Sequence, residues 1–73
     1  MNNTMYALRK KSMDYIEDKL VEQSDLKLCF RDEKEMIFKN DELLVTCKDA
    51  YIVVLFYDNS HKSKANAVIN LIS

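Results

Sequence analysis

Glycine and proline are both absent from this 73-residue chain. At average usage, a chain of this length would contain roughly eight or nine of the two together. Glycine-rich phosphate loops, dinucleotide-binding turns and nucleophile elbows need glycine where the backbone approaches closely, so these motifs are excluded. Turns that require a positive φ must use asparagine, aspartate or a strained residue instead.

Other scarce residue types exclude further kinds of site. Two cysteines, Cys29 and Cys47, are too few for a disulfide framework, and the single histidine, His61, stands far from both. We therefore expect no metal and no cofactor. No stretch approaches the roughly 20 apolar residues that a membrane span needs. The first residues lack the pattern of a signal peptide, and we expect a protein of the reducing cytosol.

The chain also has no excess of positive or negative charge. The chain has 11 basic and 12 acidic residues, a net charge of −1, and no block of like charges. Nucleic-acid-binding domains usually carry a basic excess. The balance therefore argues against a nucleic-acid partner without excluding one.

The most prominent feature present is the apolar run at residues 51–57. Its length and its β-branched and aromatic composition predict a strand. Alternate residues of a strand point to opposite faces, and here both faces are apolar. One face carries Tyr51, Val53, Leu55 and Tyr57, and the other carries Ile52, Val54 and Phe56.

The rest of the chain predicts further strands and a helix at each end. Residues 26–31, 35–39 and 43–48 predict three strands joined by short turns, with Asn40 or Asp41 as a left-handed residue; residues 32–36 would also suit a helical turn. Residues 4–23 predict an amphipathic helix, and a second amphipathic helix begins near residue 60, capped by Asn59 or Ser60. We thus expect one small α+β domain over residues 1–73: an N-terminal helix, an antiparallel meander of three to four strands in sequence order, and a C-terminal helix.

The sequence gives little support for a catalytic residue. His61 lies in a polar helix start, and Cys29 and Cys47 lie within predicted strands, where a small hydrophobic thiol is the simpler interpretation. The adjacent carboxylate pairs lie in exposed turns or on a helix face. We expect the protein not to be an enzyme.

Two binding functions remain. Lys27, Arg31, Lys39 and Lys48 could form a basic stripe with Tyr51 or Tyr57 available to stack bases, which would suit a small nucleic-acid-binding regulator. Alternatively, two short helices cover only one face of the sheet and leave an apolar face for another protein; helices on opposite faces would close both. The candidate interface residues are Ile37, Leu44, Tyr51, Ile52, Val54, Phe56 and Tyr57.

We favour the protein-binding function, as an inhibitor or regulator of a larger protein. The chain is small, rich in asparagine and lysine, and without catalytic equipment, and in this character it resembles accessory proteins of phages and plasmids, including inhibitors of host defence enzymes. We also expect a homodimer. The strand at residues 51–57 ends the predicted meander and has no proline or charge to protect its edge, so it could pair with a second copy; its Ile52, Val54 and Phe56 face could alternatively pack on one.

Overall fold

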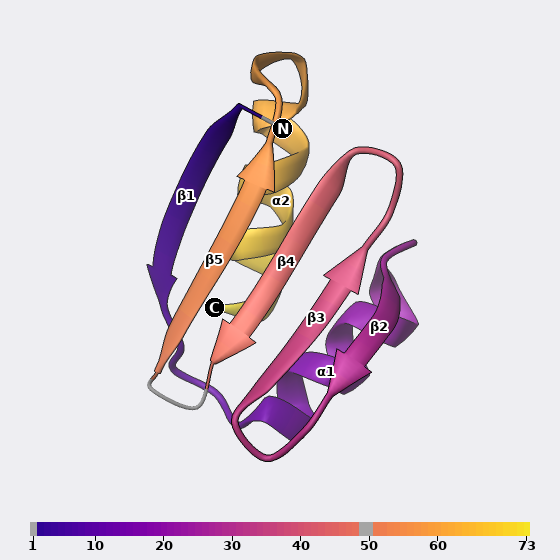
Figure 1. The fold of residues 1–73 in the computed structure, drawn as a ribbon, viewed down its shortest axis with the longest axis vertical. Coiled ribbons are helices and arrows are strands. Elements are labelled where there is room, and N and C mark those ends of the chain that lie inside the picture. Colours follow the sequence, from indigo (N-terminus) through magenta and orange to yellow (C-terminus); the bar gives the residue numbers. More distant parts are fainter. Residues whose placement is uncertain (1, 49–50) are drawn as a thin grey trace.

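The computed structural model describes residues 2–48 and 51–73, which form a five-stranded antiparallel sheet and two α-helices (Figure 1). The strands are β1 (Asn3–Leu8), β2 (Lys27–Arg31), β3 (Glu35–Lys39), β4 (Leu43–Lys48) and β5 (Ile52–Tyr57). The helices are α1 (Met13–Gln23) and α2 (Lys62–Ile72), and the 3₁₀ turn η1 (Asn59–His61) precedes α2. The predicted α+β class, meander and C-terminal helix are confirmed, although α2 begins after η1 and not at a cap on Asn59 or Ser60.

Strands β2 to β5 are neighbours in the sheet in the same order as in the sequence, as predicted. The turn between β3 and β4 is closed by Asn40, whose Oδ1 accepts hydrogen bonds from the backbone N–H groups of Glu42 and Leu43, both at 2.7 Å. The prediction that Asn40 or Asp41 is left-handed is wrong, because Tyr51 is the one described residue with a positive φ, at 64°. The turn predicted at residues 48–50 falls largely on Asp49 and Ala50, which lie outside the described residues.

The predicted N-terminal helix over residues 4–23 is wrong in its first half. Residues Asn3–Leu8 form β1, and α1 begins only at Met13. Ser12 is the N-cap of α1, and its hydroxyl accepts a hydrogen bond from the backbone N–H of Tyr15 at 3.1 Å. Residues 5–8 are all apolar, so they fit a strand pattern as well as a helix pattern, and pairing with β5 decides between the two.

The prediction that the strand at residues 51–57 is an edge strand is also wrong. β1 joins the meander beyond β5, and the order across the sheet is β1-β5-β4-β3-β2. Val54 of β5 lies opposite Tyr6 of β1 on one side and Thr46 of β4 on the other. A strand that is apolar on both faces therefore takes an interior place, where its backbone groups are bonded along both edges.

Both helices pack on the same face of the sheet. In Figure 1 they lie behind it, α2 behind β5 and β4, and α1 behind β3 and β2. The core forms between these layers, and the possibility that the helices close opposite faces is excluded. The core residues are Ile16, Leu20, Leu26, Met36, Phe38, Leu43, Val45, Cys47, Val53, Leu55, Tyr57, Ala65, Val68 and Ile72.

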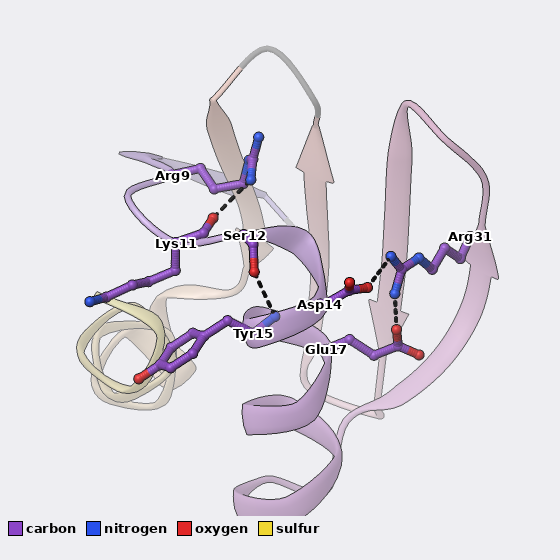
Figure 2. A network of polar contacts seen from close by, with 7 residues as sticks. All are labelled: Arg9, Lys11, Ser12, Asp14, Tyr15, Glu17 and Arg31. Carbon is purple, nitrogen blue, oxygen red and sulfur yellow. Dashed lines mark hydrogen bonds and ion pairs between the residues drawn. The ribbon is translucent and has the colours of Figure 1, made fainter.

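A charged fork holds α1 against β2. Arg31 at the end of β2 donates through Nη2 to Asp14 Oδ1 at 2.6 Å and through Nη1 to Glu17 Oε1 (Figure 2). The hydrogen bond to Asp14 raises the pKa of Arg31 above its ordinary value. Because the guanidinium is planar, it can bind two carboxylates on successive turns of the helix. This fork joins the first turns of α1 to the end of β2, beside the core contacts of Ile16 and Leu20.

Candidate functional site

The face of the sheet opposite the helices, called here the open face, is the candidate site. Residues directly opposite each other in an antiparallel pair share a face, so the strand register defines rows of side chains across the sheet. The middle row runs across every strand and has aromatic rings at both ends. It consists of Tyr6, Val54, Thr46, Ile37 and Phe30.

A second row changes from apolar to basic along its length. It consists of Thr4, Phe56, Leu44, Lys39 and Lys27. The third row contains Leu8 and Ile52, followed by Lys48 and Glu35, whose side chains form an ion pair at 3.6 Å. The open face is therefore mainly apolar over β1 and β5, mixed over β4, and more charged over β3 and β2.

The centre of the open face is shielded by its own neighbours. Val54 and Thr46 are each only 9% exposed, yet Val54 does not belong to the core beneath the helices. Tyr6 and Phe30 at the two ends of the middle row are exposed. The open face thus has a nearly buried centre and an exposed aromatic side chain at each margin.

The structure brings five of the seven candidate interface residues together. Ile37, Leu44, Ile52, Val54 and Phe56 all lie on the open face. The other two do not join them. Tyr57 is buried in the core beneath the helices. Tyr51 is exposed where β5 begins, and the Arg9 guanidinium lies 4.7 Å from the centroid of its ring.

Three apolar or aromatic residues of the open face were missed in the sequence. Tyr6 and Leu8 fell in the predicted helix, although their alternation with Met5 and Ala7 and the cap at Ser12 could have revealed β1. Phe30 was predicted to share a face with Leu28, but a bulge between these two residues shifts the register. Phe30 consequently lies opposite Ile37 on the open face, while Leu28 lies opposite Phe38 on the helix side.

The predicted basic stripe is only partly assembled. Lys27 and Lys39 lie opposite each other on the open face, and Lys48 lies on the same face but pairs with Glu35. Arg31 lies on the helix side, opposite Met36, where it binds α1. Neither tyrosine proposed for base stacking lies beside the lysine pair, since Tyr57 is in the core and Tyr51 is held by Arg9.

The titratable groups considered for catalysis are dispersed. Cys29 is exposed on β2, and Cys47 is buried in the core, where burial raises the pKa of its thiol to about 11. His61 Nε2 lies 3.4 Å from Glu42 Oε2, and the same carboxylate binds Lys64. Across residues 2–48 and 51–73, no group of three or more histidine, cysteine or carboxylate side chains could hold a metal ion.

A hollow of about 360 Å³ lies at one end of the helix layer, between the end of α1, the β3–β4 turn and α2. Its apolar wall includes Leu26 and Val68. Its polar rim is bonded internally, because Asn40 Nδ2 donates to Asp25 Oδ1 at 2.9 Å and Glu42 binds Lys64. Part of the polar rim of this hollow is thus already engaged within the chain.

Within the described residues, neither helix is long and apolar enough to cross a membrane. Comparison of the chain with protein-family models, with curated proteins and with solved structures gave no match.

Proposed function

We propose that this chain is a protein-binding module that inhibits or regulates a larger protein through its open face. The observation that carries the proposal is the placement of both helices on one side of the sheet, which leaves the apolar rows on the other side uncovered. From ordinary strand spacing and rise, the open face spans about 20 Å in each direction, or roughly 400 Å². Its apolar part lies mainly over β1 and β5, and exposed apolar patches on a small protein often mark interaction sites.

The charges on the open face support a partner with an acidic surface. The lysines at positions 27 and 39 are exposed and have no carboxylate within ion-pair distance among the described residues. They lie at the β2–β3 end of the face, beside the apolar half. A complementary partner presents an apolar surface flanked by acidic groups at that end, since opposite charges across an interface fix its orientation and speed its formation.

The proposed setting is a reducing cytosol, where the exposed thiol of Cys29 remains unpaired. The other thiol, Cys47, is buried beneath the helices and out of reach of a disulfide partner at the surface. Binding through the sheet would act by covering a functional surface of the larger protein. The chain would then need no reaction of its own to inhibit or regulate that protein.

Capture of a partner from the native host, compared across matched variants, tests this function. Ile37→Lys and Leu44→Lys place charges on the open face and should each reduce capture at least about tenfold. Val21→Lys changes an exposed apolar residue on α1 and should leave capture unchanged. Circular dichroism would confirm that each variant is folded. If the captured protein is retained equally by all three variants, the open face is not its binding site.

A second set of variants tests the charge of the partner. Reversing both open-face lysines, with Lys27→Glu and Lys39→Glu together, should weaken capture and slow association. Lys62→Glu at the start of α2 is the matched control, because it changes an exposed lysine on the opposite layer. Unchanged capture by the double variant would contradict an acidic partner surface.

A small nucleic-acid-binding regulator is the second candidate function, favoured by the exposed Phe30 ring near the paired lysines on an open sheet. Exposed aromatic rings on a sheet can stack single-stranded bases. Salt separates the two functions, because the logarithm of nucleic-acid affinity falls by about 0.7–0.9 per phosphate contact for each logarithmic unit of salt. Steeply salt-dependent binding to an oligonucleotide, abolished by Phe30→Ala and by the double lysine reversal, would favour this alternative over the protein partner.

A further inference from the structure

The two outer strands of the sheet differ in how their free edges are protected. β2 carries Lys27 and Arg31 and is interrupted by the bulge between Leu28 and Phe30. Bulges and charges of this kind discourage pairing with another chain. β1 has neither a bulge nor a charge. Its segment, Asn3–Leu8, also contains no proline, and its six residues pair with β5 in an unbroken register. The edge of β1 is therefore open to a further strand.

The direction of the free backbone groups follows from the ladder between β1 and β5. The backbone N–H of Arg9 donates to the carbonyl of Tyr51 at 2.7 Å, just beyond the end of β1. Bonded and non-bonded pairs alternate along an antiparallel ladder. Counting back from Arg9, Ala7, Met5 and Asn3 direct their backbone groups toward β5. Thr4, Tyr6 and Leu8 direct theirs toward the free edge.

We propose that a second copy of this chain pairs its β1 with this edge, antiparallel and about a two-fold axis at Tyr6. In this register Tyr6 lies opposite Tyr6 of the second copy, and Thr4 lies opposite Leu8 of the second copy. Every outward-directed residue is then paired. A register centred on Met5 leaves Leu8 unpaired, and a slip by one residue would place the apolar rows of the two copies on opposite faces.

Side chains on the open face add to the backbone pairing. Tyr6 is 67% exposed and Leu8 is 75% exposed in the single chain. Across the two-fold axis, the Tyr6 rings form an aromatic pair, and each Leu8 packs beside a Thr4, which are contacts that stabilise neighbouring strands. The occupant is a second copy because a two-fold axis needs only one self-complementary patch. The combined sheet keeps both open faces on one side and available to another protein.

Sedimentation equilibrium of the purified chain tests the dimer without any other partner. The mass should rise from 8.6 kDa toward twice that value as the concentration reaches about 100 μM, because an interface of one strand pair is small. Tyr6→Lys places two like charges opposite each other and should raise the dissociation constant at least about tenfold. Leu28→Lys on the β2 edge should leave it unchanged. A single-chain mass at every concentration would overturn the proposal.

The same measurement distinguishes two possible dimer contacts, the edge of β1 and the open face. If Ile37→Lys dissociates the dimer and Tyr6→Lys does not, the two copies pack face to face and the proposed edge pairing is wrong. If Tyr6→Lys alone dissociates it, the edge is supported. This result does not depend on the proposed protein partner. A dimer that captures no partner and a monomer that captures one are different outcomes, so the two proposals can fail separately.

Cysteine cross-linking tests the register. In a Cys29→Ser background, Tyr6→Cys should form a covalent dimer under mild oxidation, because residues at the two-fold axis lie within reach of a disulfide. Thr4→Cys is the matched control on the same strand and face. Its copies are four residues out of register, about 13 Å apart, and should not cross-link. Cross-linking through Thr4→Cys and not through Tyr6→Cys would overturn the register.

Discussion

Tyr6 of β1 lies directly opposite Val54 of β5, and both side chains stand on the open face of the sheet. The tyrosine is mostly exposed, whereas Val54 is nearly buried although no described helix covers it. Its neighbours in the row are Tyr6 on one side and Thr46 on the other. β1 therefore completes the open face as well as the sheet.

Two adjacent valines of β5 should differ in their contribution to stability. Val53 is 1% exposed in the core beneath the helices, and Val54 lies on the open face. Val53→Ala leaves a cavity between the layers and should lower the free energy of unfolding by about 2–3 kcal/mol. Val54→Ala should cost about 1 kcal/mol, because the open face can close around the smaller side chain. Urea denaturation measures both, and equal losses would mean that the open face is packed as tightly as the core.

Much of this fold could be predicted because local signals agreed with the tertiary structure. The segments of β3, β4 and β5 are flanked by polar residues in the sequence, and the apolar stripe of α2, with Ala65, Val68 and Ile72, faces the core as its periodicity indicates. These segments carry one dominant pattern each. Their pairing in sequence order then follows from the short connections.

The errors arose where the local pattern was ambiguous or the deciding contact was remote. Residues 5–8 are apolar at every position, so their pattern fits a helix and a strand equally. They form a strand because they pair with β5, which is remote in the sequence. The bulge in β2 turns Phe30 to the open face without any glycine to signal it. Five of the seven candidate interface residues could still be found, because alternation along β3, β4 and β5 assigned their faces correctly. The same alternation placed Tyr51 and Tyr57 on the opposite face of β5, and the structure indeed separates them from the other five.

The β2–β3 turn should lose stability in acid through Asp32. Its Oδ1 accepts hydrogen bonds from the backbone N–H groups of Lys34 at 2.7 Å and Glu35 at 2.9 Å. These bonds hold the pKa of Asp32 below its ordinary value of 3.8. Because the folded pKa is depressed, the charged carboxylate stabilises the fold above pH 3.8, and this contribution is lost as the pH falls through the folded value.

The variant Asp32→Asn tests this contribution because it keeps an acceptor oxygen and removes the charge. Its deficit in stability relative to the parent chain should be constant near neutral pH and should shrink below about pH 4. Asp41→Asn is the matched control, since it removes a carboxylate from the neighbouring turn, which Asn40 closes. Thermal unfolding between pH 2 and 7 gives both profiles. The same pH dependence in both variants would show that net charge is responsible and the turn is not.

Alkaline pH should destabilise the fold through Cys47. Burial raises the pKa of its thiol from 9.0 to about 11, so the unfolded chain releases this proton at a lower pH than the folded chain does. Stability is therefore unaffected by this group below pH 9 and falls as the pH rises from 9 to about 11. The loss is about 2–3 kcal/mol at the upper limit. Denaturant unfolding at several pH values should show this component in Cys29→Ser and not in Cys47→Ala. A component of equal size in both variants would assign it to other groups.

A buried arginine joins the end of β1 to the segments around it. Arg9 is 9% exposed, and its side chain donates through Nε to the carbonyl of Lys48 at 3.1 Å and through Nη1 to the carbonyl of Lys11 at 2.8 Å (Figure 2 shows the second bond). Its guanidinium also lies over the ring of Tyr51. Tyr51 has a left-handed backbone, which costs a residue other than glycine about 1–2 kcal/mol. Arg9 helps to hold Tyr51 in that conformation.

Replacement of Arg9 should therefore weaken the packing of β1 on β5. Arg9→Met keeps much of the apolar stem but leaves the carbonyls of Lys48 and Lys11 without these donors, and should lower the free energy of unfolding by about 2–3 kcal/mol. Arg9→Lys should lose less, because a single ammonium can still bond one carbonyl but lacks the planar fork. Lys10→Met is the control at the exposed neighbouring position and should stay within about 0.5 kcal/mol of the parent. Hydrogen exchange should show the largest loss of protection in β1, since Arg9 lies where β1 leaves the sheet. Equal stability of Arg9→Met and Lys10→Met would show that the arginine does not hold this end of the sheet together.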